Sequence, residues 1–172
     1  MPTSHTKRVR PHIQKKSRKK KYAKRYKQLP AIPHPTYVAY FDGACGPANP
    51  GGTAAYGAVI VQEGQRIWEC RELFHPAQGK ERETSNNLAE YCGLIAVLEH
   101  LLALGAQHEP IMVYGDSKLV IEQMLGHWKI RAGIYTPYAR KALALCRTFT
   151  HLRGQWIPRE QNTVADALSK AP

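Results

Sequence analysis

The sequence Tyr37-Val38-Ala39-Tyr40-Phe41-Asp42-Gly43 joins a run of apolar, β-favouring residues to one acidic residue and a glycine. An apolar run of this length predicts a strand buried in a sheet, and Asp42 is expected to end it. Side chains alternate along a strand, so Asp42 shares a face with Val38 and Tyr40. An Asp before a Gly commonly forms only a turn. However, a carboxylate in an apolar setting is costly unless it is paired, hydrogen-bonded or bound to a metal. This stretch therefore predicts both the first strand of a domain and one candidate functional residue.

The segments after this strand predict an α/β domain with the element order βββαβααβα. Turn residues fill Gly46–Gly52, and Glu63-Gly64 joins the next two strands as a hairpin. A helical repeat of apolar residues begins at Ser85 or Asn86, either of which can cap it, and Gly105 ends it. The predicted strands cover 37–41, 54–62, 66–74, 111–114 and 151–157, and the predicted helices cover 85–104, 118–125, 137–148 and the residues after 162. Together they predict a five-stranded mixed sheet flanked by helices.

Three further acidic residues lie where predicted elements begin or end. Glu90 is in line with the apolar residues of its helix and so points toward the core, although a boundary glutamate that reaches water is the alternative. Asp116 lies at the carboxyl end of a strand, where open α/β sheets place their ligands, but Asp116 or Ser117 can also cap the next helix. Asp166 falls in the first turn of the last helix, which Asn162 caps, and the helix dipole alone favours an acid there.

Each of these acids has an ordinary explanation, but their recurrence at the ends of strands and helices indicates one shared site. Asp42, Glu90, Asp116 and Asp166 can converge in a mixed sheet. A cluster of carboxylate oxygens without His or Cys partners favours Mg²⁺ or Mn²⁺ over zinc. The four cysteines are widely spaced, which predicts reduced thiols and neither a zinc site nor a disulfide framework.

The net positive charge of the chain is confined to its first 36 residues. They contain twelve Lys or Arg and no acid, whereas the remainder contains thirteen basic and thirteen acidic residues, so the net charge of +12 belongs to this segment. Because such a segment cannot bury apolar surface, residues 1–36 are expected to form a disordered basic arm that ends in a stiff proline-rich linker. Residues 7–27 suit binding to nucleic acid through counterion release. The alternatives are a solubilising tail, a localisation signal or, with a poorer match in composition, a transit peptide.

The hydropathy pattern argues against a membrane protein. No stretch approaches the roughly 18 apolar residues of a membrane span, and no signal-peptide hydrophobic region follows the start. We therefore expect a soluble, cytoplasmic monomer of 172 residues in which residues 37–172 form one domain.

The acids lie in four ordered motifs between residues 37 and 171. The motifs are Phe41-Asp42-Gly43-Ala44-Cys45 with Asn49-Pro50-Gly51-Gly52, Ser85-Asn86-Asn87-Leu88-Ala89-Glu90, Gly115-Asp116-Ser117 and Asn162-Thr163-Val164-Ala165-Asp166. Together they resemble type 1 ribonuclease H. One Asp-Gly pair would be a weak signal, whereas four motifs in this order and at these separations are specific. The resemblance implies the ribonuclease H-like fold and Mg²⁺-dependent cleavage of the RNA strand in an RNA–DNA hybrid.

The resemblance also implies roles for individual residues. The four acids match those that hold two Mg²⁺ ions, with Mn²⁺ as a substitute, in a two-metal mechanism that leaves 5′-phosphate and 3′-hydroxyl ends. Minor-groove contacts, where 2′-hydroxyls distinguish RNA from DNA, are implied for Asn49, Asn86 and Asn87. Gly43 is also expected among the substrate-binding residues. A DNA phosphate contact is implied for Ser85 and a place in the DNA-strand channel for Trp128. Helix capping by Ser85 and core packing of Trp128 are the alternatives.

Two features depart from the pattern of many bacterial members of the family. The stretch 157–162 is short and has no counterpart of a His-bearing loop proposed to assist product release, so Arg159, Glu160 or no residue takes over that step. In this respect the chain looks more like the compact archaeal-type members. The family's basic protrusion is reduced to residues 126–138, and we expect the N-terminal arm to replace its electrostatic grip on the hybrid.

Two other functions compete with that of a hybrid-specific endoribonuclease. A related nuclease of the same fold, such as a resolvase or an exonuclease, would act on other substrates, but the asparagines at 49, 86 and 87 argue against it. A non-catalytic nucleic-acid-binding protein that uses the arm would not need all four acids. An NTPase is excluded because Gly46–Gly52 lacks the Lys-Ser/Thr ending of a phosphate-binding loop.

Overall fold

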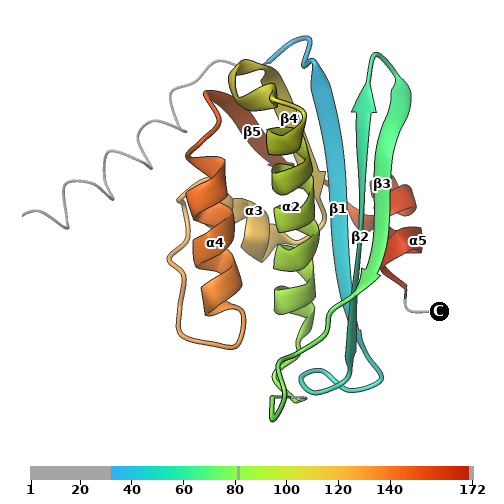
Figure 1. Ribbon diagram of the computed structural model, residues 1–172, viewed down its shortest axis with the longest axis vertical. Helices are drawn as coiled ribbons and strands as arrows, with labels where there is room; N and C mark the ends of the chain where they lie inside the picture. The colour runs from blue at the N-terminus through green and yellow to red at the C-terminus, as the bar shows by residue number, and fades with distance from the viewer. Residues whose placement is uncertain (1–31, 81, 171–172) are drawn as a thin grey trace, which may run out of the picture.

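Five strands form one mixed sheet in the computed structural model, which describes residues 32–80 and 82–170 (Figure 1). The spatial order is β3-β2-β1-β4-β5. In it β1 and β2, and β2 and β3, are antiparallel, whereas β4 runs parallel to both β1 and β5. The strands are β1 (Tyr37–Gly46), β2 (Thr53–Gln62), β3 (Gln65–Leu73), β4 (Pro110–Gly115) and β5 (His151–Trp156). The predicted mixed sheet is confirmed. The predicted basic arm lies almost entirely outside the described residues.

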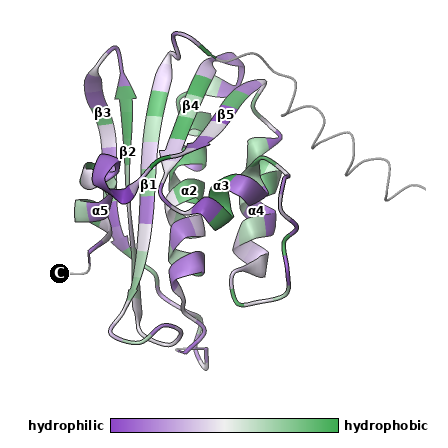
Figure 2. Cartoon of the chain, turned by 180° about the vertical axis from the view of Figure 1, so that it is seen from behind, coloured by the Kyte–Doolittle hydropathy of each residue, from purple (hydrophilic) through white to green (hydrophobic). Residues whose placement is uncertain are grey.

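Helices cover both faces of the sheet, with α2, α3 and α4 on one side and α5 on the other (Figures 1 and 2). The helices are α2 (Asn86–Ala103), α3 (Lys118–Met124), α4 (Thr136–Cys146) and α5 (Thr163–Ser169), with short 3₁₀ turns η1 (Ala106–His108) and η2 (Arg159–Gln161). The edge strand β3 is exposed along most of its length and is mainly hydrophilic in Figure 2. Among the described residues, no helix combines the length and apolar character needed to cross a membrane.

The core lies between α2 and the central strands. The apolar face predicted for this helix is buried, with Leu94 and Leu98 fully enclosed beside Phe41 of β1. Ser85 caps the helix, because its Oγ accepts a hydrogen bond of 3.2 Å from the Leu88 amide. Gly105, at φ 73°, follows the last turn in the left-handed conformation that glycine accepts without strain. Both ends of the predicted helix are therefore confirmed.

Long-range pairing corrects the predicted end of the first strand. The ladder between β1 and β2 continues through Asp42, which pairs with Gly57, and runs on to Gly46. Asp42 therefore lies inside β1 rather than at its end, and the prediction that it ends the strand is wrong. The hairpin after β2 is confirmed, since Glu63 and Gly64 both have positive φ angles, as a two-residue turn of this hand requires.

Candidate active site

Three carboxylates from three separate elements converge at the centre of the sheet. Asp42 belongs to β1, Glu90 to the first turns of α2, and Asp116 directly follows β4. Each offers one oxygen, and these oxygens all lie within 4.8 Å of one another. Parallel β1 and β4 pair Phe41 with Gly115, so the residues after them, Asp42 and Asp116, occupy neighbouring strands at the same height. The fold thus places these three predicted acids next to one another.

Gly43 allows α2 to bring Glu90 to the sheet. A Cβ atom at this position would lie 2.1 Å from the Glu90 backbone nitrogen and 2.2 Å from the Ala89 carbonyl carbon. Backbone atoms cannot move away from such a contact as a flexible side chain can. The start of α2 thus rests directly on the backbone of β1, which gives Gly43 a structural role in the site.

The three carboxylates crowd one another in a largely dry setting. Asp42 is 5% exposed, and burial raises its pKa to about 6, although a hydrogen bond from Ser169 lowers it and the charge of Asp116 raises it. Burial, then the charges of Asp42 and Asp116, raise the pKa of Glu90 well above its usual range. Glu90 Oε2 is buried and has no hydrogen-bond partner among the described residues.

A divalent cation fits this arrangement. It would offset the repulsion between the carboxylates and provide a partner for the orphaned Glu90 oxygen. The donor set consists of carboxylate oxygens alone, which hard ions such as Mg²⁺ and Mn²⁺ prefer. The described residues thus contain a candidate metal site built from Asp42, Glu90 and Asp116.

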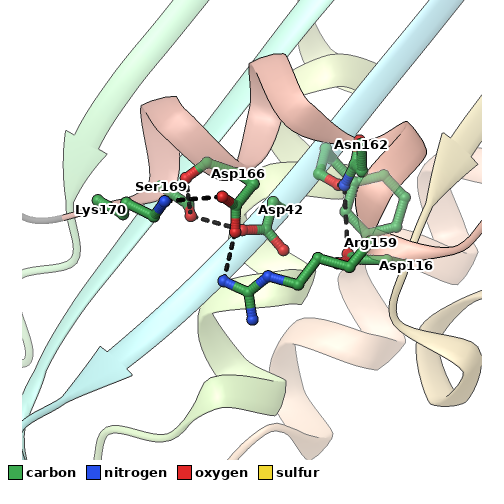
Figure 3. A network of polar contacts seen from close by, with 8 residues as sticks. Asp42, Asp116, Arg159, Asn162, Asp166, Ser169 and Lys170 are labelled. Atoms are coloured by element: carbon green, nitrogen blue, oxygen red, sulfur yellow. Dashed lines mark hydrogen bonds and ion pairs between the residues drawn. The ribbon is translucent and has the colours of Figure 1, made fainter.

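Asp166 is held differently from the other three acids. One of its oxygens pairs with the Arg159 guanidinium, and the other lies 2.9 Å from Lys170 Nζ (Figure 3). These bonds, that of Lys170 first, hold the pKa of Asp166 below its usual range against the opposing effect of burial. Its charge still raises the pKa of Asp42, so the two carboxylates are neighbours. The structure thus brings three of the predicted acids together and leaves the fourth beside them in ion pairs.

Asn162 contacts the site instead of capping its helix. It occupies the N-cap position of α5, but its Nδ2 donates to the carbonyl oxygen of Phe41 at 2.9 Å and to Asp116 Oδ1 at 3.2 Å. The prediction of a capping side chain is therefore wrong. Ser117 likewise holds the N-cap position of α3 without a side-chain capping bond. The sequence did contain one signal that Asn162 lies near the acids: it precedes Asp166 by four residues, a spacing that places both on one face of a helix.

Two of the three asparagines predicted to contact substrate, Asn49 and Asn86, connect the end of β1 and the loop after it to the start of α2. Asn49 Oδ1 accepts a hydrogen bond of 3.1 Å from the Asn86 amide, and Asn86 Oδ1 accepts one of 2.6 Å from the Cys45 amide. Asn86 is exposed and Asn87 is half-buried beside it. These side chains form one edge of the site, next to the N-terminal turn that carries Glu90.

Two tryptophans of the described residues are exposed. Trp128 is 47% exposed in the connection between α3 and α4, so the alternative of core packing is wrong. The loop that carries Trp128 is held by the buried side chain of Gln123, which donates to the Lys129 carbonyl oxygen and accepts from the Tyr91 hydroxyl. Trp156, which the sequence analysis did not single out, is 44% exposed, and its Nε1 donates to the Asp116 carbonyl oxygen at 2.9 Å.

Comparisons with known proteins agree with this geometry. A family model described as reverse transcriptase-like matches residues 40–171. The N-terminal ribonuclease H domain of Rv2228c from Mycobacterium tuberculosis is 36% identical, with a TM-score of 0.67 over 77% of this chain and 94% of that one. Ribonuclease H1 from Halobacterium salinarum is 35% identical, with a TM-score of 0.65 over 77% of this chain and 92% of that one. The chain belongs to the type 1 ribonuclease H family.

The whole Rv2228c protein of Mycobacterium tuberculosis, described as bifunctional, is longer than this ribonuclease H family member. The two are 38% identical over 123 residues, which make up 70% of this chain but only 31% of that protein. The chain therefore spans less than a third of the length of this curated relative.

In this ribonuclease H family member the connection between β5 and α5 is short. Residues 159–161 form η2, and the Arg159 side chain, two-thirds exposed, contacts Asp166. Glu160, the other residue considered for this region, is exposed. Of the two, Arg159 is thus the one that directly contacts a predicted metal-binding acid.

Proposed function

We propose that the chain is an endoribonuclease that hydrolyses the RNA strand of RNA–DNA hybrids and leaves 5′-phosphate and 3′-hydroxyl ends. The convergence of Asp42, Glu90 and Asp116 in a member of the type 1 ribonuclease H family carries this proposal. A ribonuclease H1 called LC11, 31% identical with a TM-score of 0.66, has been solved in complex with an RNA/DNA hybrid, which supports the choice of substrate.

The proposed cofactor is a pair of Mg²⁺ ions, for which Mn²⁺ can substitute. Asp42, Glu90 and Asp116 would hold them together with Asp166, and bound ions would activate the attacking water and stabilise the leaving 3′ oxygen. Both Asp166 oxygens already accept from cations, and we propose that Arg159 or Lys170 moves away from one of them when Asp166 binds a metal ion. Arg159 is then free to meet the phosphate of the substrate, which makes it our candidate for assisting product release.

The proposed substrate surface lies next to this centre. Asn49, Asn86 and Asn87 would contact 2′-hydroxyls in the minor groove of the hybrid, close to Gly43. Their proximity to one another and to Glu90 supports this assignment. The exposed Trp128 would line the channel for the DNA strand, and the hydroxyl of Ser85 would meet a DNA phosphate at the start of α2.

The basic arm is proposed to bind the hybrid by its phosphates. Residues 7–27 hold all twelve cationic side chains of the first 36 residues, and releasing counterions makes such binding steeply dependent on salt. Deleting residues 1–35 should weaken hybrid binding in EDTA and flatten its salt dependence. If affinity and slope were both unchanged, the arm would have another role.

Cleavage of matched substrates tests the main proposal. Labelled RNA–DNA hybrid, duplex RNA and duplex DNA are incubated with the protein in Mg²⁺ or in EDTA, and only the hybrid in Mg²⁺ should be cut. Cleavage of another duplex would indicate a related nuclease, and binding without cleavage would indicate a non-catalytic protein.

Variants on one helix connect cleavage to the cluster. Glu90→Gln should reduce the cleavage rate by more than about 100-fold, since even indirect partners of metal ligands contribute 10- to 100-fold. Glu99→Gln is the matched control, because Glu99 lies on the same helix and pairs with Lys141 on the surface. Full activity in Glu90→Gln, Asp42→Asn or Asp116→Asn would refute the metal assignment.

A further inference from the structure

A buried hydroxyl at the end of α5 contacts the central carboxylate of the site. Ser169 is 1% exposed, and its Oγ lies 2.5 Å from Asp42 Oδ2 and 3.0 Å from the carbonyl oxygen of Asp166 (Figure 3). The two partners in the first bond are 127 residues apart in the chain. Ser169 was not among the residues that the sequence motifs indicated.

The sheet is shaped to admit this helix end. Gly57 of β2 pairs with Asp42 across the ladder, and a Cβ atom there would lie 2.4 Å from Leu168 Cβ and 2.6 Å from the Ser169 nitrogen. Any side chain at Gly57 would therefore push the last turn of α5 away from β1. The contact between Ser169 and Asp42 thus depends on a close approach of backbone to backbone.

The chemistry of the contact suits a metal-binding carboxylate. A serine hydroxyl has one proton to donate, and an ionised carboxylate is a stronger acceptor than a carbonyl oxygen. The proton therefore goes to Asp42 Oδ2 when Asp42 is ionised, and this bond restrains the orientation of the carboxylate from one of its two oxygens. Unlike the Arg159 and Lys170 cations beside Asp166, a hydroxyl brings no positive charge that would compete with a metal ion.

We propose that Ser169 is a positioning residue that holds the Asp42 carboxylate in the orientation required to bind a divalent cation. This inference rests on the metal site of the proposed function. Groups that hydrogen-bond to metal ligands typically contribute 10- to 100-fold to metal affinity or activity. Ser169→Ala should therefore weaken cation binding without preventing the fold from forming.

The test measures binding of Mn²⁺ to the full-length protein by titration calorimetry, in the absence of nucleic acid. Ser169→Ala should raise the dissociation constant by about tenfold or more. It should also raise the Mg²⁺ concentration for half-maximal hybrid cleavage, with the rate largely recovered at saturating Mg²⁺. Thermal unfolding in EDTA reports whether each variant is folded. If Ser169→Ala does not fold, Ser169→Cys, which is nearly the same size but a weak donor, replaces it.

Thr148→Ala is the matched control. Thr148 Oγ1 donates to the Leu145 carbonyl oxygen three residues earlier at a helix end, as Ser169 can to Asp166, but it lies in an exposed position away from the carboxylates. This variant should bind Mn²⁺ like the wild type. The inference would be overturned if a folded Ser169→Ala or Ser169→Cys protein bound Mn²⁺ with wild-type affinity. It would also be overturned if Asp42→Asn bound Mn²⁺ as tightly as the wild type does.

Failure of this inference is distinguishable from failure of the proposed function. A wild type that binds Mn²⁺ through Asp42 but cuts no hybrid would refute the function and leave the role of Ser169 standing. A Ser169→Ala protein that binds Mn²⁺ and cleaves the hybrid like the wild type would refute the role of Ser169 and leave the proposed function standing.

Discussion

Removing the charge of Asp42 should stabilise the metal-free protein while abolishing its activity. Burial raises the pKa of this carboxyl from 3.8 to about 6, and a rise of that size corresponds to about 3 kcal/mol of free energy against the ionised form at high pH. Because the folded pKa exceeds the unfolded one, the contribution of Asp42 to stability is fully present below about pH 4. It is lost as the pH rises through about 6. Asn cannot ionise and so escapes this loss.

The net gain for Asp42→Asn is smaller than the full electrostatic cost. The pKa of about 6 already includes the effect of the Ser169 bond, so the reduction comes from replacing one oxygen of the carboxyl group by an NH₂ group. This changes the hydrogen bonds of a buried group by about 1 kcal/mol. We therefore expect a gain of about 1–2 kcal/mol at pH 8 in EDTA, or a rise of roughly 3–6 °C in Tm. At pH 4, close to the pKa of 3.8 of the unfolded carboxyl group, the stability difference between the variant and the wild type should shrink to about 0.5 kcal/mol or less. Added Mg²⁺ should narrow or reverse the gap at pH 8, because only the wild type gains from cation binding.

Calorimetric melting of both proteins at pH 4 and pH 8 measures these differences. Asp166→Asn is a control of opposite sign, because the ion pairs of Asp166 hold its pKa below the usual value. Their contribution is present at pH 8 and is lost as the pH falls, so Asp166→Asn should lower stability at pH 8, by no more than about 1 kcal/mol for such exposed partners. A lower Tm for Asp42→Asn than for the wild type at pH 8 in EDTA would refute the reasoning.

Two further variants test the packing and the ion pairs of the site. Gly43→Ala places a methyl group 2.1 Å from the Glu90 backbone nitrogen and should cost about 3 kcal/mol or more in urea unfolding. Gly46→Ala, whose added carbon meets nothing within 4 Å, should stay within about 0.5 kcal/mol of the wild type, and equal losses in both variants would contradict the packing argument. Arg159→Ala should raise the pKa of Asp166 toward its usual range, as measured by carboxyl NMR titration in EDTA, whereas an unchanged pKa would show that the pair is absent in solution.

Local patterns in the sequence were sufficient to predict the order of the elements. The apolar run Tyr37–Phe41, the apolar repeat of α2 and the Glu63-Gly64 turn each depend on residues close together in the chain. The predicted end of the first strand was wrong, because β1 is extended to Gly46 by pairing with β2, and pairing between strands leaves little local signal. The Asp-Gly pair was treated as a strand end on its turn tendency, and the ladder overrode that tendency.

The site was predicted in part for the same reason. Asp42, Glu90 and Asp116 could be assigned from their places on a strand face, on a helix face and after a strand, together with the family motifs around them. The partners of these acids could not be assigned. Asn162 donates to a backbone carbonyl 121 residues away, and neither its place before the helix nor its spacing from Asp166 identified that partner.

The sequence by itself therefore determined the mixed sheet, the buried face of α2 and the identity of the acidic residues, because hydropathy and turn preferences act over a few neighbouring positions. Only the tertiary structure decided which charges meet. It placed α5 on the opposite face from α2, brought Ser169 against Asp42 through the gap left by Gly57, and paired Asp166 with two cations. Electrostatic and hydrogen-bond energies depend on distance in space, and the fold sets that distance independently of separation along the chain.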